Sequence, residues 1–298
     1  MFIHTGTTQL IPPEVAISMK HRFMSFSPVS ETTLNVQNLT SLQSCKLHFF
    51  AIGGYNVSLT SSLPLWINTS PCTPSVMKDS DEFFTAGISE RERRSFEIMK
   101  DRPVVQVDFA KLLTIYYQPG LASDWDVFPL RSFPSQWTEF DTCDVYFGIE
   151  HTCRDKGCLE GGNFARYTQL QNWMMASARL KSPTLRKIID AIMDQAETQV
   201  KEHGSINHLG VQDVCGSGII SDVIRNEITI STAGKMTDYW EPVNASDDEI
   251  GRFNFNGDRV CIGGLKYSGT YCGGGSCLVN HRFEGSWKGD RLWRKEKS

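Results

Sequence analysis

Residues 107–130 read VDFAKLLTIYYQPGLASDWDVFPL, a sequence in which helix, turn and strand signals follow one another without a gap. The first half is apolar and carries Asp108 and Lys111 one helical turn apart on one face, which is typical of a helix packed on a core. A Pro-Gly turn follows, and then a strand-like segment that contains Asp124 and Asp126. The stretch therefore predicts a helix, a turn and a strand in succession, with two carboxylates near a strand end.

The overall composition is that of an ordinary folded protein. Of the 298 residues, 40% are apolar and 21% are charged, which is enough for one large domain or two small ones. Lys and Arg number 30 against 34 Asp and Glu, so the formal net charge is −4. Nucleic acid is therefore a poor candidate for a partner. No apolar stretch reaches the roughly 18–20 residues of a membrane span, so the sequence as given predicts a soluble chain.

Helices and strands are predicted to alternate along the rest of the chain. Residues 145–149 (VYFGI) indicate a buried strand. Residues 183–201 indicate a helix that Ser182 caps and Pro183 begins. Residues 253–262 favour a hairpin with a tight Asn-Gly turn. The predicted class is therefore α/β or mixed.

The chain is expected to divide at residue 62. Residues 1–61 are rich in Ser, Thr and Asn and only weakly periodic, so we expect a poorly defined segment with a candidate remnant of a first strand. Residues 62–298 form the expected catalytic domain. The glycines at 216–218 and 273–275 lack the spacing of phosphate-binding loops and predict a turn and a loop. Zinc-protease, serine-hydrolase and P-loop motifs are absent from the sequence.

The cysteines and sequons leave the compartment open. Nine cysteines is an odd number, and none forms the C-x-x-C pair of zinc ribbons or thioredoxins. Two pairs with four intervening residues, Cys153 with Cys158 and Cys272 with Cys277, allow short disulfide loops. Four N-x-S/T sequons favour a secretory lumen only mildly; they lie at Asn38, Asn56, Asn68 and Asn244. The first residues, MFIHTGTTQL, do not resemble a signal peptide.

The pair Asp124 and Asp126 is the clearest candidate for chemistry. Side chains at i and i+2 of an extended segment project to the same side, and two carboxylates so placed repel unless a cation joins them. Mn²⁺ or Mg²⁺ is the natural cation, because hard divalent ions take oxygen ligands and share them with substrate phosphates. A D-x-D motif alone is weak evidence, but its position after a buried helix and a turn strengthens it.

Residues 107–130 resemble the A-D-x-x-R-Y-x-x-L-Y-x-x-G-G-x-Y-x-D-x-D signature of sugar transferases, in particular glycosyltransferase family 32. Fungal members of that family include the initiation-specific α-1,6-mannosyltransferases of the Golgi. Later segments resemble further blocks of the family in the same order: residues 147–150 (FGIE), 169–173 (QLQNW) with the helix from 183, 211–223 (VQDVCGSGIISDV) and 281–288 (HRFEGSWK). The resemblance covers about residues 62–290.

The resemblance implies a GT-A type fold, in which a Rossmann-like half that binds the nucleotide sugar is continuous with an acceptor half. The D-x-D motif then lies at a strand end. By the same resemblance, Asp126 holds a divalent metal ion, Mn²⁺ or Mg²⁺, and Asp124 contacts the ribose of the donor or the metal through water. His281 matches a C-terminal histidine that completes the metal shell.

The resemblance also assigns residues to the donor. Asp108 matches an aspartate that reaches the ribose or the donor sugar, and Lys111 replaces an arginine that faces the donor sugar or its phosphates. Asn172 takes the place of a Gln or Asn near the donor sugar. The residues expected around the diphosphate are Gly285, Ser286, Trp287 and Lys288.

The implied reaction moves mannose from GDP-mannose to a mannose hydroxyl of an N-glycan with retention of configuration. A metal ion with Lys288 and Lys111 is expected to stabilise charge on the leaving diphosphate, and no dedicated protein base is required. The implied location is the Golgi lumen or membrane, with a glycosyltransferase complex as partner. Two alternatives stay open: use of another hexose donor, and a catalytically weak relative that acts as a binding subunit of a glycosylation complex.

Several of these residues also have purely structural interpretations. In one, Asp108 and Lys111 form an ion pair on a helix surface. In another, His281 is a core histidine. Trp173 is favoured as a packing residue only. Glu150 and the histidine after it are explained equally well as a solvated strand end or as acceptor contacts.

Overall fold

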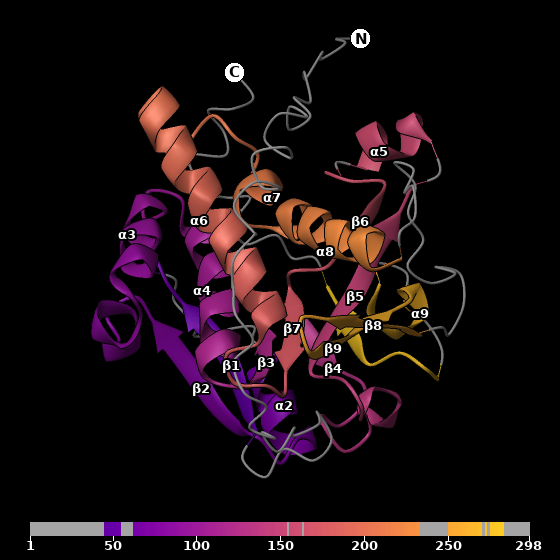
Figure 1. Ribbon diagram of the computed structural model, residues 1–298. Coiled ribbons are helices and arrows are strands. Elements are labelled where there is room, and N and C mark those ends of the chain that lie inside the picture. Colours follow the sequence, from indigo (N-terminus) through magenta and orange to yellow (C-terminus); the bar gives the residue numbers. More distant parts are fainter. Residues whose placement is uncertain are drawn as a thin grey trace. The chain divides into compact units, whose positions relative to one another are not determined.

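The structure is a computed structural model that describes residues 45–54, 62–153, 155–162, 164–232, 250–269, 272 and 275–282. All of these residues belong to one compact unit, Val36–Ser298. Within this unit a mixed sheet lies between a layer of helices and a second hydrophobic layer (Figure 1). No helix among the described residues is long and apolar enough to cross a membrane.

The central sheet contains eight of the described strands. Their order is β2 (Thr73–Lys78), β1 (Lys46–Ala51), β3 (Gly120–Ser123), β7 (Met174–Ser177), β5 (Val145–Thr152), β9 (Asp258–Gly263) and β8 (Ile250–Phe255), with β6 (Thr168–Leu170) paired to β5. The pairs β1–β2, β1–β3 and β5–β9 are parallel, whereas β7 runs antiparallel to both β3 and β5. Strands β1, β2, β3, β5 and β9 therefore point in one direction, and their carboxyl ends meet at one edge of the sheet.

Two hydrophobic layers cover the sheet. Over one face lie α3 (Glu90–Ile98), α4 (Pro103–Tyr117), α6 (Pro183–His203), α7 (Val211–Val214) and α8 (Ser217–Thr232), which gather together in Figure 1. Phe109, Ile188 and Ile220 from three of these helices are fully buried in one cluster with Phe147 of β5. The second cluster is rich in aromatic side chains and receives residues from α2 (Leu63–Thr69), η3 (Thr138–Phe140) and α9 (Leu265–Ser268).

Three further elements lie outside these layers. They are the short helical segment η2 (Phe83–Gly87), α5 (Lys156–Gly162), and a separate two-stranded antiparallel sheet of β4 (Val127–Pro129) with β10 (Val279–His281). The small sheet matters most for function, because it brings the C-terminal part of the described chain against the segment that follows β3.

Most elements expected from the sequence are confirmed. The class is α/β, and the largely parallel sheet is consistent with a GT-A type fold. Helix α4 includes the apolar first half of residues 107–130, as predicted, and α6 begins at Pro183. The oxygen Oγ of Ser182 accepts a hydrogen bond from the backbone N–H of Leu185 at 3.2 Å, and Gly204 ends α6 in the left-handed conformation. The predicted Asn256-Gly257 turn joins β8 to β9 with positive φ at both residues.

Other expectations are corrected. Residues 46–51 (KLHFFA) form β1, an inner strand, although they lie in the segment expected to be poorly defined; the part of that segment before residue 45 lies outside the described residues. Because four consecutive residues of β1 are buried, the strand lacks the alternation that marks a half-exposed strand. The predicted turn at 216–218 contains the first residues of α8. The strand-like segment 121–130 divides into β3 and β4.

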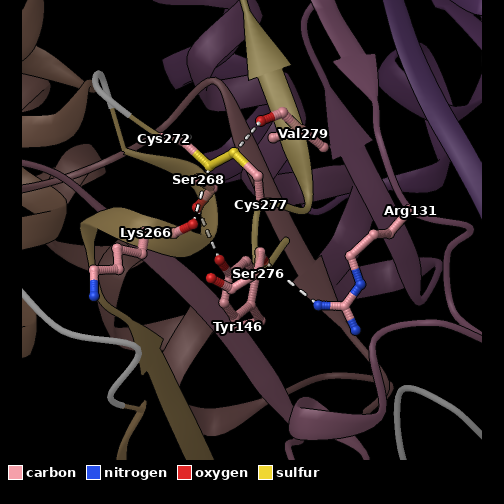
Figure 2. Close-up of a disulfide and its surroundings, with 8 residues drawn as sticks. All are labelled: Arg131, Tyr146, Lys266, Ser268, Cys272, Ser276, Cys277 and Val279. Carbon is pink, nitrogen blue, oxygen red and sulfur yellow. Dashed lines mark hydrogen bonds between the residues drawn. A yellow bond between two sulfur atoms is a disulfide. The ribbon is translucent and has the colours of Figure 1, made fainter. Parts of the chain in front are cut away.

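Four disulfides link eight of the nine cysteines, and Cys215 remains a buried thiol. Cys45–Cys72 and Cys143–Cys261 join segments that are distant in sequence. The other two disulfides are the short loops that the sequence allowed, Cys153–Cys158 and Cys272–Cys277. Figure 2 shows the second of these beside β10.

His48 lies on β1, the strand between β2 and β3, and its imidazole is fully buried. Its Nε2–H donates to the carbonyl of Gln118 at 3.0 Å, and its Nδ1 has no hydrogen-bond partner among the described residues. A second ring proton would therefore be buried without an acceptor. Burial accordingly lowers the pKa of His48 to about 4.

This pKa predicts acid sensitivity that a single substitution removes. Since the folded state binds the His48 proton less readily than the unfolded state, stability is complete above pH 6.5 and is lost as the pH falls toward 4. Between pH 7 and pH 5 the free energy of unfolding should fall by about 2 kcal/mol more in the natural chain than in His48→Gln. Urea unfolding at both pH values measures this difference. Equal losses in the two proteins would contradict it.

Candidate metal and donor site

Asp124 and Asp126 lie in the turn that joins β3 to β4, at the carboxyl edge of the sheet. The backbone N–H of Asp124 donates to the carbonyl of Trp173 at 2.9 Å, which ties the turn to the start of β7. The indole of Trp125 donates to a carbonyl of β1 at 2.7 Å. The predicted strand-end position is confirmed, but the two aspartates occupy a turn rather than an extended strand.

His281 of β10 completes a cluster with these two aspartates. Antiparallel pairing places His281 opposite Val127, directly after the turn. Its Nε2 lies 3.2 Å from Oδ1 of Asp126, and one ligand atom from each of the three side chains lies within 4.8 Å of the others. The ring of Trp173 supports the imidazole, with centroids 4.5 Å apart. Two carboxylates and an imidazole are a donor set that suits Mn²⁺ or another divalent ion of similar preference.

Lys111 lies inside α4 and reaches the same turn. Its Nζ is 2.5 Å from Oδ1 of Asp124 and 3.0 Å from Oδ1 of Asp108, and it donates to the carbonyl of Asn172 at 3.3 Å. Only 2% of the Lys111 side chain is exposed, so the surface ion pair considered from the sequence is in fact a buried one. The resemblance assigns Lys111 to the donor sugar or its phosphates; in the structure its ammonium pairs with the carboxylates of Asp108 and Asp124.

Burial and mutual charge shift the pKa values of this trio. Burial raises the pKa of Asp108 to about 6, with the Asp124 carboxylate acting in the same direction and Lys111 opposing it. Burial also raises the pKa of Asp124, despite Lys111. For Lys111 burial alone would lower the pKa, but the two carboxylates raise it, and the lysine stays charged.

Glu150 adds a further carboxylate from the end of β5. Gln169 Nε2 donates to Oε2 of Glu150 at 2.8 Å. The amide of Gln169 is oriented by Ala165, whose N–H donates to Oε1 of Gln169 at 2.7 Å. Burial raises the pKa of Glu150, while the hydrogen bond from Gln169 and the nearby His281 oppose the shift. Glu150 is therefore built into the wall of the site, which argues against a freely solvated strand end.

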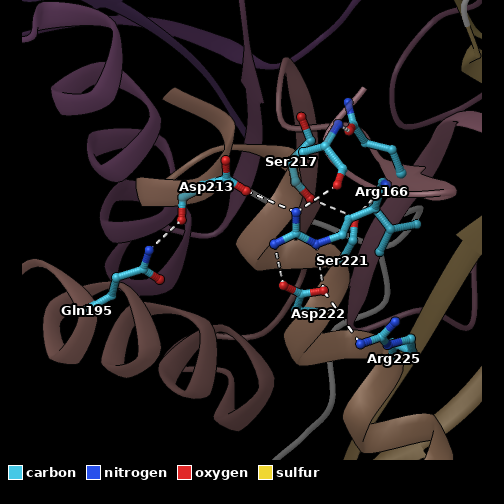
Figure 3. Close-up of polar contacts among 10 residues, drawn as sticks. Arg166, Gln195, Asp213, Ser217, Ser221, Asp222 and Arg225 are labelled. Carbon is cyan, nitrogen blue, oxygen red and sulfur yellow. Dashed lines mark hydrogen bonds and ion pairs between the residues drawn. The ribbon is translucent and has the colours of Figure 1, made fainter. Parts of the chain in front are cut away.

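An ion-pair network behind Glu150 was not foreseen from the sequence. The guanidinium of Arg166 lies 2.9 Å from Oδ1 of Asp213 and 2.6 Å from Oδ2 of Asp222, and so joins α7 to α8 (Figure 3). The hydroxyl of Ser221 accepts a hydrogen bond from Leu170 N at 2.8 Å, which fixes α8 to β6. Residues 211–223, one of the family-like blocks, thus hold α7, α8 and β6 together around Glu150. Long-range charge pairs of this kind leave no local pattern.

The remaining predicted site residues divide into two groups. Asn172 lies beside Lys111 and Gly216, where a Cβ on the glycine would come within 3.4 Å of the Asn172 Nδ2. Trp173 is a packing residue, as favoured, but its carbonyl and ring also contact Asp124 and His281. The predicted diphosphate contacts lie outside the described residues: Gly285, Ser286, Trp287 and Lys288.

Comparisons with known proteins add little to this geometry. No protein-family model matches the chain, and a search of curated proteins finds no match. Among solved structures, the chain is similar to the "PaToxG Glycosyltransferase" with a TM-score of 0.45 and 14% identity, covering 64% of this chain and 72% of that one. A similarity of this size does not assign an activity.

Proposed function

We propose that this chain is a metal-dependent glycosyltransferase. The observation that carries the proposal is the convergence of Asp124, Asp126 and His281 at the carboxyl edge of the sheet. In open α/β sheets this edge is where ligands bind. The order of the family-like sequence blocks supports the finer proposal, transfer of mannose from GDP-mannose to a mannose hydroxyl of an N-glycan with retention of configuration.

In this proposal, different residues of the site bind the metal ion and the donor sugar. Asp126 and His281 would hold Mn²⁺ or Mg²⁺, and such an ion supplies positive charge against a leaving diphosphate. Lys111 keeps the carboxylates of Asp108 and Asp124 in place by pairing with both. In this proposal the two carboxylates accept hydrogen bonds from donor hydroxyls. Retention needs no separate protein base when the leaving phosphate takes the acceptor proton.

One observation favours a second candidate function, a catalytically weak relative that binds nucleotide sugar as a subunit of a glycosylation complex. The Lys111 ammonium lies 2.5 Å from Oδ1 of Asp124, a carboxylate of the candidate metal cluster. Asp124 is therefore already neutralised by the protein. This pairing weakens any metal site that depends on it, and leaves Asp126 and His281 as the ligands available to an ion.

The test is release of GDP from GDP-mannose in the presence of Mn²⁺ and a high-mannose N-glycan. We expect release that needs both metal and acceptor, and that falls at least about 100-fold in Asp126→Asn. Asp141→Asn is the matched control, since Asp141 is an exposed aspartate that ends η3 and is not part of the D-x-D turn. Melting temperatures with Mn²⁺ and GDP are measured on the same proteins.

The outcomes separate the candidates. Release that depends on Asp126 supports the transferase. Stabilisation by GDP and Mn²⁺ without release from GDP-mannose or from a panel of other hexose nucleotides supports the binding subunit. Neither release nor stabilisation would overturn both. If mannosyl transfer is found, we propose the Golgi lumen or membrane as its location and other glycosyltransferases as partners, which fluorescence localisation and co-purification test.

A further inference from the structure

A second cluster of ligand-type side chains lies at the carboxyl end of β5, directly after Glu150. His151 and Cys153 belong to this strand end, and Cys158 lies in α5, the short helix that follows it (Figure 1). His151 Nε2 is 3.3 Å from Sγ of Cys158, and one ligand atom from each of the three side chains lies within 4.8 Å of the others. Nothing in the proposed transferase chemistry uses these three residues.

The imidazole and both cysteines are held in place by their surroundings. The His151 ring stacks on Phe164 with centroids 4.1 Å apart and planes 7° from parallel. Cys153 is fully buried, and its N–H donates to the carbonyl of Tyr167 at 2.6 Å. Cys158 N donates to Oδ1 of Asp155 at 2.8 Å. The donors therefore come from a preformed loop rather than from freely rotating side chains.

The chain contains an internal comparison for this cluster. Cys272 and Cys277 have the same spacing and also form a disulfide. Their sulfur atoms face backbone carbonyls instead of an imidazole: Sγ of Cys272 lies 3.1 Å from Lys266 O, and Sγ of Cys277 lies 3.6 Å from Val279 O (Figure 2). Among the described residues, Cys153 and Cys158 belong to a cluster of three ligand-type side chains, whereas Cys272 and Cys277 do not. Histidine is what distinguishes the two loops.

We propose that His151, Cys153 and Cys158 form a binding site for Zn²⁺ or a cation of similar softness when the Cys153–Cys158 disulfide is reduced. A dithiol reductant supplies two electrons and two protons, leaves as its own disulfide, and yields two thiols. Binding of the cation then releases the two thiol protons, because thiolates are the ligands. Two thiolates and one imidazole leave a fourth tetrahedral position for water.

This site differs in chemistry from the cluster at the D-x-D turn. Oxygen ligands dominate at the turn and suit hard ions, whereas sulfur ligands at the end of β5 suit borderline or soft ions. Under oxidising conditions the loop can thus be closed by the Cys153–Cys158 disulfide. Under reducing conditions it can be closed by a metal ion that the two cysteines and His151 bind. Either link fixes the loop that follows Glu150.

The test uses Co²⁺ as a spectroscopic substitute for Zn²⁺ on the full chain, before and after mild reduction with a phosphine. The reduced protein should show a sulfur-to-cobalt charge-transfer band that Zn²⁺ bleaches, and the oxidised protein should show none. Cys272→Ser/Cys277→Ser should keep the band, whereas Cys153→Ser/Cys158→Ser should lose it. Cobalt bound at the D-x-D turn cannot give the band, since that site offers no sulfur.

His151→Phe tests the role of the imidazole while keeping the aromatic contact with Phe164. Its Co²⁺ affinity should fall at least 10-fold, because even supporting residues around a metal are worth about 10–100-fold in affinity. Melting curves of the metal-free proteins show whether each variant is folded. Unchanged affinity in folded His151→Phe, or loss of the band in the Cys272→Ser/Cys277→Ser protein, would overturn the proposal. His151→Gln supplies the same test if His151→Phe does not fold.

Discussion

Lys111→Met should lower the free energy of unfolding by about 3–5 kcal/mol, the usual loss when one partner of a buried ion pair is removed. The lysine Nζ lies within 3.0 Å of Asp108 and within 2.5 Å of Asp124, and its side chain is 2% exposed. Methionine fills a similar volume but leaves two carboxylates facing each other without a cation. The loss in the free energy of unfolding therefore measures how much the lysine charge stabilises the two carboxylates, rather than a change in packing.

Urea unfolding at pH 7 measures the effect, with Lys187→Met as the matched control. Lys187 also forms a close pair, 2.7 Å from Glu227, but its side chain is 31% exposed. Exposed pairs contribute at most about 1 kcal/mol, so the control should change little. Similar losses in the two variants would contradict the buried role of Lys111.

Acidification should partly restore the Lys111→Met protein. Burial already raises the pKa of Asp108 to about 6, and removal of the opposing lysine raises it further. A carboxyl whose pKa is higher in the folded state stabilises that state as the pH falls through the folded value. The deficit of the variant relative to the natural chain should therefore shrink between pH 7 and pH 5.

The same variant bears on the two proposed functions. With the ammonium gone, the Asp124 carboxylate becomes available to a divalent ion. Mn²⁺ should then raise the melting temperature of Lys111→Met by more than it raises that of the natural chain. A larger shift would mean that the lysine competes with metal for Asp124, as the binding-subunit candidate requires. Equal shifts would mean that Asp126 and His281 suffice.

The sequence predicted elements whose signals are local. Ser182, Pro183 and the apolar stripe behind them place the start of α6 correctly. The same helix start also depends on Asp258, whose Oδ2 accepts hydrogen bonds from Ser182 Oγ at 2.6 Å and Thr184 N at 2.8 Å. Asp258 follows the hairpin turn and lies 76 residues away from Ser182. No local pattern connects the two.

In the candidate site, too, some features have a local sequence signal and others depend on long-range packing. The spacing of Asp124 and Asp126 indicates a metal site, the family resemblance adds His281, and the structure brings the three side chains together. The position of Lys111 was not predictable, because it depends on which side of an almost wholly buried α4 faces β3. In an amphipathic helix, the positions of the polar residues show which face packs on the core. A helix that is buried on all sides lacks this pattern. Packing alone sets the lysine between two carboxylates.

The second large effect is expected from the Cys143–Cys261 disulfide. Both cysteines are fully buried, and the bond links the start of β5 to β9 across 118 residues of sequence. Cross-linking so long a loop removes many conformations from the unfolded chain. By the chain-entropy relation, the bond is worth about 5 kcal/mol, whereas a loop as short as Cys153–Cys158 is worth about 2 kcal/mol.

Cys143→Ala/Cys261→Ala should therefore lose about 3 kcal/mol more than Cys153→Ala/Cys158→Ala in the free energy of unfolding. Urea unfolding of both variants beside the natural chain measures this difference. Equal losses would mean that the long cross-link does not act through the unfolded chain. The 143–261 loop contains Trp173 and Glu150, while the D-x-D aspartates and His281 lie outside it. Without the bond, the part of the site that carries Glu150 and Trp173 should open independently of the D-x-D turn. Hydrogen exchange would detect this opening as faster exchange in β5 and β7.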